Sequence, residues 1–123
     1  MASHNELGRL GEEKAREFLL EKKYKIVACN WRFRQKEIDM IALKDGFLVF
    51  VEVRTRTSSK WEHPRESITP AKIRFLVLAA DAYIKQCEVD DPVRFDVVTC
   101  MPIKDSDKWE IELIENAFTA QVE

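Results

Sequence analysis

Apolar and polar residues follow two different periods along this chain, and the changes of period mark its elements. Apolar residues recur at helical spacing near the start and again after Thr69, which precedes Pro70 as in a typical helix start. Elsewhere they alternate with period two or run continuously, as in strands. The pattern predicts a first helix that begins with a Ser3–Glu6 capping box and runs to about residue 21. After it we expect a strand, a hairpin, a helix and two strands, over residues 24–33, 36–56, 70–86, 94–101 and 108–114.

The order helix, three strands, helix, two strands predicts an α/β fold in one domain over residues 1–123. Its sheet should be mixed and flanked by helices, because a hairpin is antiparallel whereas a helical crossover lets the next strand run parallel. The strand at 94–101 is almost continuously apolar, so we expect both of its faces to be buried. A chain of 123 residues that is 46% hydrophobic is long enough for a proper core.

The turn of the hairpin predicts which residues oppose each other. Asp45-Gly46 between two alternating apolar runs favours a two-residue type I′ turn, which pairs positions whose numbers sum to 91. In this register Asp39 faces Glu52 on one side of the sheet. The other side is apolar, and Ile38 lies on it with Met40.

Two directly opposed carboxylates destabilise a sheet unless a cation compensates them. The same register puts Glu37 opposite Arg54, so a guanidinium lies next to the acids. The cation is therefore Arg54 or a metal ion. The first alternative is a salt-bridge cluster that closes a sheet edge, and the second is a site for a hard divalent cation, which prefers oxygen ligands.

The first helix holds two of the chain's three glycines, Gly8 and Gly11. A glycine inside a helix costs about 1 kcal/mol relative to alanine, which indicates that another segment approaches closely there. Glu12 lies beside this notch, at the edge of the apolar stripe. It is either a residue at the rim of the helix or a third carboxylate directed along the sheet.

Charge and composition narrow the classes of function. The net charge is −2, but residues 22–74 carry +7 and residues 75–123 carry −7. The basic segment is either a polyanion-facing surface or a solvated face. The longest apolar run is too short to cross a membrane and the first 21 residues are too charged for a signal peptide, so we expect a cytoplasmic protein. Three cysteines without CxxC spacing support neither a disulfide framework nor a zinc knuckle.

Several short motifs occur in order between residues 7 and 98. They are Gly8-x-x-Gly11-Glu12-x-x-Ala15, Asn30-Trp31-Arg32, Glu37-Ile38-Asp39, Phe50-Val51-Glu52-Val53-Arg54-x-Arg56, Lys72, and Arg94-Phe95-Asp96-Val97-Val98. Together they resemble the YraN-like family of uncharacterised bacterial proteins. That family belongs to the PD-(D/E)XK, or restriction-endonuclease-like, superfamily, which also contains Holliday-junction resolvases. The resemblance implies a restriction-endonuclease-like αβββαβ core.

The resemblance also implies a Mg²⁺- or Mn²⁺-dependent endonuclease that acts on DNA. Asp39 and Glu52 match the metal-binding acids of the superfamily, and Glu12 matches the acid that some members place on the first helix. Arg54 occupies the position of the usual lysine, where an arginine supplies charge but no base because it keeps its proton. These four residues form the candidate catalytic set, and the three acids are the candidate metal ligands.

Basic and aromatic residues of the same region are candidate nucleic-acid contacts. They are Lys36, Arg56, Lys60, Trp61, Arg65 and Lys72. Lys36 replaces the glycine of the usual Gly-Glu-Ile-Asp run, and Lys72 matches a family lysine near a helix N-terminus, where phosphate is favoured. Trp61 either stacks on a base or covers the core.

Three functions fit these observations. The preferred one is a metal-dependent endonuclease-like protein that hydrolyses or binds DNA, including branched or structured DNA. The alternatives are a non-catalytic nucleic-acid-binding module of the same fold and a protein-interaction adaptor whose acidic C-terminal part carries the function. Because resolvase-like proteins often dimerise, a homodimer is a candidate assembly.

Overall fold

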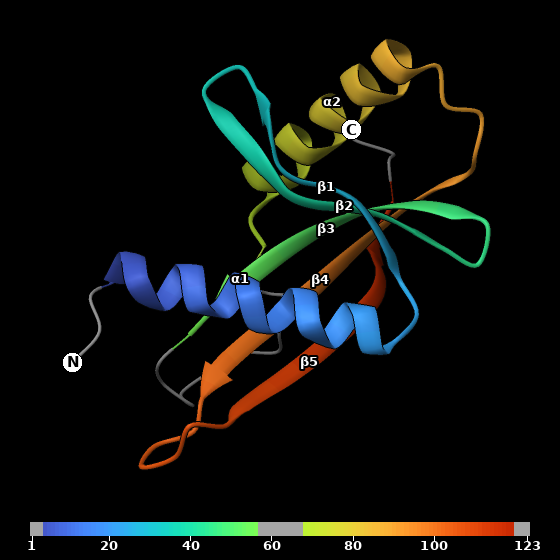
Figure 1. Cartoon of the computed structure of the whole chain (residues 1–123). Helices are drawn as coiled ribbons and strands as arrows, with labels where there is room; N and C mark the ends of the chain where they lie inside the picture. The colour runs from blue at the N-terminus through green and yellow to red at the C-terminus, as the bar shows by residue number, and fades with distance from the viewer. Residues whose placement is uncertain (1–3, 57–67, 120–123) are drawn as a thin grey trace.

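The computed structural model describes residues 4–56 and 68–119, and Figure 1 shows its helices and strands. The elements are α1 (His4–Glu21), β1 (Lys25–Phe33), β2 (Lys36–Lys44), β3 (Phe47–Thr55), α2 (Pro70–Cys87), β4 (Val93–Pro102) and β5 (Trp109–Phe118). This is the predicted order. The last strand continues to Phe118, four residues beyond its predicted end.

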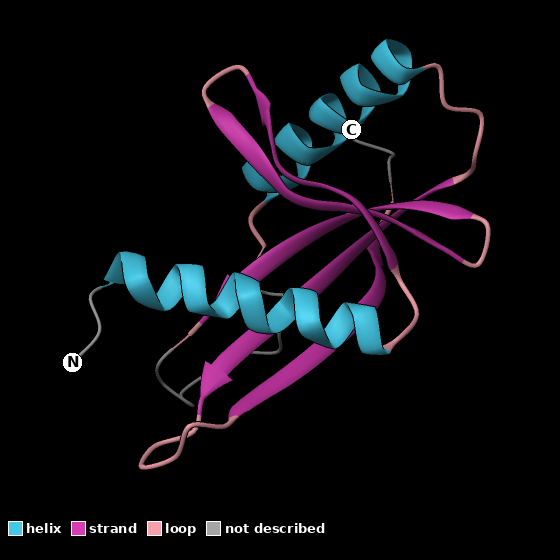
Figure 2. Ribbon diagram, viewed as in Figure 1, coloured by secondary structure: helices cyan, strands magenta, loops and turns pink. Residues whose placement is uncertain are grey.

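The five strands form one sheet in the order β1-β2-β3-β4-β5 (Figure 2). All neighbouring strands are antiparallel except β3 and β4, which run parallel and are connected through α2. The mixed sheet with a helical crossover is therefore confirmed, and the arrangement agrees with a restriction-endonuclease-like core. Neither described helix has the length and apolar character needed to cross a membrane.

Strand alternation separates the interior into two cores, one on each face of the sheet. Ala15 and Leu19 of α1 pack on one face against Met40, Ala42, Val49, Val51, Val98 and Cys100. On the other face, Leu76, Ala79, Ala80 and Tyr83 of α2 pack against Ile41, Leu48, Phe50 and Phe95. β4 is buried throughout residues 95–100, as its apolar sequence predicted.

α1 approaches the end of β3 closely at one glycine. A Cβ atom at Gly11 would overlap the Thr55 hydroxyl and lie 3.1 Å from Thr55 Cβ, and the Cys100 thiol donates to the Gly11 carbonyl at 3.5 Å. A Cβ at Gly8 would have no neighbour within 4 Å. The predicted close approach is thus confirmed at Gly11 and wrong at Gly8.

Most left-handed backbone positions in the described part of the chain are occupied by residues other than glycine. Asp45 (φ 51°) and Gly46 (φ 83°) form the left-handed turn that was predicted between β2 and β3. Lys23 (φ 72°) follows α1, and Glu88 (φ 52°) is the left-handed cap of α2, where its N–H donates to the Ile84 carbonyl. At the other end of α2, the Thr69 side chain accepts the Lys72 N–H at 3.2 Å, which confirms the predicted helix start.

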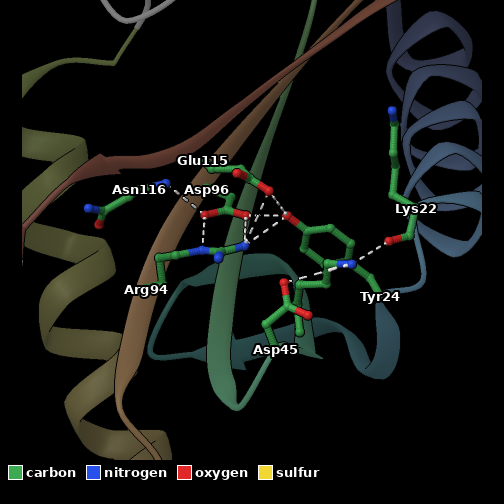
Figure 3. Close-up of polar contacts among 8 residues, drawn as sticks. Lys22, Tyr24, Asp45, Arg94, Asp96, Glu115 and Asn116 are labelled. Carbon is green, nitrogen blue, oxygen red and sulfur yellow. Dashed lines mark hydrogen bonds and ion pairs between the residues drawn. The ribbon is translucent and has the colours of Figure 1, made fainter.

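Asp96 is a buried charge within the apolar β4, and Figure 3 shows that its carboxylate is fully engaged. It accepts hydrogen bonds from the Tyr24 hydroxyl at 2.7 Å, from Arg94 Nε and Nη2 at 2.9 and 2.8 Å, and from the Asn116 N–H at 2.9 Å. Burial and the bond to Asp96 raise the pKa of Tyr24, so its hydroxyl remains a donor. The cluster joins the start of β1 to β4 and β5, which gives the Arg94-Phe95-Asp96 motif a structural role.

Candidate metal centre

β2 and β3 separate at the two acids of the hairpin. The strands pair from Lys44 with Phe47 to Met40 with Val51, which confirms the predicted register over these residues. The pairing of β2 with β3 stops there, and the Asp39 carboxylate instead accepts a hydrogen bond from the Val53 N–H at 2.7 Å. Asp39 therefore takes the place of a strand partner at the fork between β2 and β3.

Beyond the fork, β2 follows β1 rather than β3. Glu37 pairs with Arg32 of β1, with 3.6 Å between the charged groups, so its predicted pairing with Arg54 is wrong. The placement of Ile38 on the face of Met40 is also wrong, because Ile38 is buried in the core on the α2 side. The period-two alternation breaks at Asp39, where β2 twists away from its hairpin partner.

Glu52 is buried beside two cations. It is only 3% exposed, and its Oε2 lies 3.6 Å from Lys72 Nζ and 3.7 Å from Arg54 Nη1. Its other oxygen, Oε1, is buried without a hydrogen-bond partner in the described part of the chain. Burial raises the pKa of Glu52, while the charges of Lys72 and Arg54 act in the opposite direction. A buried oxygen without a partner costs on the order of 1–3 kcal/mol, which a bound ligand would offset.

Asp39 shares the electrostatic environment of Glu52. Burial and then the charge of Glu52 raise the pKa of Asp39 to about 8, against the lowering effect of the Val53 N–H. Two carboxyl groups in this situation cannot both ionise at low cost without a further cation. Burial and the charge of Glu52 therefore favour the protonated form of Asp39, and a further cation would favour its ionised form.

Glu12 reaches the same region from α1 but is held by another partner. It lines a pocket of about 190 Å³ together with Asp39, and its charge adds to the raised pKa of that residue. Its Oε1 accepts a hydrogen bond from Asn30 Nδ2 at 3.0 Å. Within residues 4–56 and 68–119, no three acidic, histidine or cysteine side chains already form a metal-binding group. Of the other two acids, Glu52 has the larger effect on the pKa of Asp39 and Glu12 the smaller one.

These residues fit a hard divalent cation. Mg²⁺ in proteins commonly uses one or two carboxylates and keeps several waters. Here Glu52 offers an oxygen that has no hydrogen-bond partner among the described residues, and Asp39 lies beside it with one oxygen on the Val53 N–H. The excess negative charge that raises the pKa of Asp39 is also what a cation would neutralise.

Three of the six predicted nucleic-acid contacts lie within the described residues. Lys36 and Lys72 both lie near Phe75, with their ammonium groups 5.5 and 5.4 Å from the centroid of its ring. Arg56 directly follows β3, and its N–H donates to the Cys100 carbonyl at 2.8 Å. Lys60, Trp61 and Arg65 lie outside the described residues.

Two residues of this region were not predicted as part of the site. Asn30 holds Glu12, and its left-handed backbone (φ 51°) in a strand marks it as unusual. Phe75 gathers two lysines around its ring. The only sequence signal for it was an aromatic residue three positions after Lys72, on the same side of a helix.

Comparison with known proteins identifies the family. Residues 11–100 match the model of the uncharacterised protein family UPF0102, a span that includes all three acids. A UPF0102 protein of Bacteroides fragilis is 44% identical over 118 residues, which cover 96% of both chains. UPF0102 proteins of Flavobacterium psychrophilum and Flavobacterium johnsoniae are 42% and 43% identical, each over 96% of this chain and 98% of the relative. UPF0102 is the YraN family, so the predicted resemblance is confirmed and the chain belongs to the uncharacterised protein family UPF0102.

Proposed function

We propose that this protein is a cytoplasmic, metal-dependent endonuclease that hydrolyses phosphodiester bonds in DNA. The observation that carries the proposal is the pair of buried acids at the fork between β2 and β3. Glu52 has one oxygen without a hydrogen-bond partner in residues 4–56 and 68–119, and Lys72 and Arg54 lie within 4 Å of its other oxygen. Such an arrangement is typical of a site that holds a cation and an anionic phosphate together.

Asp39 and Glu52 would hold Mg²⁺ or Mn²⁺, and Glu12 would join them by releasing Asn30. When bound, such an ion polarises a phosphoryl oxygen and lowers the pKa of a water molecule. The Arg54 guanidinium lies next to Glu52 and is partly exposed, so it can meet a phosphate without leaving the site. Its permanent charge would stabilise the negative charge that develops on the phosphate.

Lys72 compensates for the arginine at position 54. Its ammonium group lies as close to Glu52 Oε2 as the guanidinium does, at 3.6 Å against 3.7 Å. An ammonium group can lose a proton where a guanidinium cannot. Lys72 of α2 would thus take the role of the lysine that other superfamily members carry on the strand, at the position of Arg54.

The test is cleavage of supercoiled, linear, single-stranded and four-way-junction DNA with Mg²⁺ or Mn²⁺. We expect Asp39→Asn and Glu52→Gln each to lower the cleavage rate by about 10² or more. Asp81→Asn is the matched control, because Asp81 pairs with Lys85 on the exposed side of α2. Cleavage that survives both site substitutions would contradict the assigned site.

One observation favours a second candidate, a nucleic-acid-binding module without catalysis. Arg54 can neutralise Glu52 permanently, which is what a silent site requires. In that case DNA binding would fall steeply with salt and no cleavage would occur. A gain of cleavage in Arg54→Lys would then identify this position as the cause.

A further inference from the structure

A groove of about 480 Å³ lies between the turn that joins β1 to β2 and the first turns of α2. In Figure 1 this hairpin arches beside α2. The side chains that matter for its chemistry are Phe33, Arg34, Lys36, Arg74, Phe75 and Leu78. Three of them are basic, and none of the described residues that line this groove is acidic; we call it the hairpin groove.

Two aromatic rings and three basic side chains line the hairpin groove. The rings of Phe33 and Phe75 lie 6.1 Å apart and are tilted by 45°. The Arg34 guanidinium lies 4.9 Å from the centroid of Phe33, and Lys36 Nζ lies 5.5 Å from that of Phe75. Leu78 is 55% exposed and extends the apolar surface. Both rings are only partly buried, so one ligand could contact rings and positive charges together.

This combination fits unpaired nucleotides. A base in a single strand exposes its π face, and stacking on an aromatic side chain with cations on the backbone is the usual way to bind such strands. A duplex hides those faces, so it would use the cations alone. An apolar peptide would leave three positive charges without partners. The three basic side chains, with no acidic one among the described residues of the lining, favour an anionic ligand.

The hairpin groove is connected to the candidate metal centre through one residue. Lys72 Nζ lies 5.4 Å from the Phe75 centroid and 3.6 Å from Glu52 Oε2. A strand that stacks on Phe75 would therefore pass a phosphate near the acids at the fork.

We propose that the hairpin groove binds a single-stranded segment of nucleic acid next to the bond presented to the acids. Bases stack on Phe33 and Phe75, and the phosphates meet Arg34, Lys36 and Arg74. The role in substrate choice rests on the proposed function, whereas the binding itself needs no metal.

The test measures the anisotropy of a labelled DNA oligonucleotide, as a single strand and as a duplex, with the full chain in EDTA. We expect the single strand to bind at least about tenfold more tightly at equal salt. Phe75→Leu keeps an apolar side chain but removes the ring, and it should weaken single-strand binding about tenfold. Circular dichroism verifies that this variant is folded.

A second pair of variants keeps the test decisive if Phe75→Leu is unstable. Arg74→Gln removes one charge within the groove, and it should lower the slope of log K against log salt by about 0.7. Lys85→Gln removes one charge from the same helix outside the groove and should leave the slope unchanged. Equal binding of single strand and duplex, or equal effects of Arg74→Gln and Lys85→Gln, would overturn the inference.

The two proposals fail separately. Calorimetry with Mn²⁺ should give the same affinity for wild type and Arg74→Gln, because Arg74 does not contact the acids. Loss of the single-strand preference with intact Mn²⁺ binding and cleavage would overturn the hairpin groove alone. Single-strand preference without Mn²⁺ binding or cleavage would overturn the endonuclease and leave the groove.

Discussion

The two glycines of α1 should respond to alanine in opposite ways. At Gly8 a Cβ meets nothing within 4 Å, so Gly8→Ala should raise the free energy of unfolding by about 0.5–1 kcal/mol through helix propensity. At Gly11 the same gain is opposed by overlap with the Thr55 hydroxyl and by contacts of 3.1 Å with Cβ and Cγ2. Overpacking of this kind costs about 1–3 kcal/mol, so Gly11→Ala should lower the free energy of unfolding by about 1–2 kcal/mol.

Thr55→Ala provides the matched background for this comparison. It removes the Oγ1 and Cγ2 atoms that a Cβ at Gly11 would meet, so Gly11→Ala should lose most of its cost there. Because Glu12 follows Gly11, a displaced α1 would also carry that carboxylate away from Asp39, and Gly11→Ala should bind Mn²⁺ more weakly. Urea unfolding followed by circular dichroism measures the stabilities, and calorimetry measures the affinity. Equal stability of the two alanine variants, or no rescue by Thr55→Ala, would refute the reasoning.

Three further predictions concern charged groups. Asp39→Asn should raise the melting temperature in EDTA near pH 7.5. Folding raises the pKa of Asp39 from its ordinary 3.8 to about 8, so the folded protein binds this proton more tightly than the unfolded chain does. The free energy of unfolding of the wild type should therefore fall as the pH rises between these two values. An identical pH slope in Asp39→Asn would contradict this reasoning. Tyr24→Phe should lower the free energy of unfolding by about 1–2 kcal/mol in urea titrations, because it removes one donor from the buried Asp96; a wild-type midpoint would argue against this. Lys72→Gln should lower cleavage about 10²-fold while Lys85→Gln does not, and a wild-type rate in Lys72→Gln would remove Lys72 from the proposed chemistry.

Local turn chemistry made the hairpin predictable only as far as Met40. Asp45-Gly46 admits one alignment of its flanking residues, and the pairs from 40 to 44 with 51 to 47 follow it. The fork could not be predicted, because it depends on β1 holding β2 and on Ile38 entering the α2-side core. The contacts of Asp39 with the Val53 N–H and of Glu52 with Lys72 arise from that divergence.

Contacts between residues that are distant in sequence could not be predicted either. A single acid within the apolar strand at 94–101 indicates that Asp96 has a buried partner, but no pattern identifies Tyr24, 72 residues away. The same limit applies to the hairpin groove, whose two halves come from the β1–β2 turn and from α2. Periodicity assigns residues to faces, whereas the packing of helices on the sheet decides which faces meet.

Residues other than glycine occupy left-handed turns outside the candidate metal centre, so the protein can be stabilised there without changing that centre. Lys23 after α1 and Glu88 at the end of α2 hold backbone angles that suit glycine, at a cost of roughly 1 kcal/mol each. Replacing both with glycine would give a more stable background protein in which to substitute the buried acids. In such a background, a variant of Asp39 or Glu52 that no longer cleaves DNA would report on chemistry rather than on unfolding.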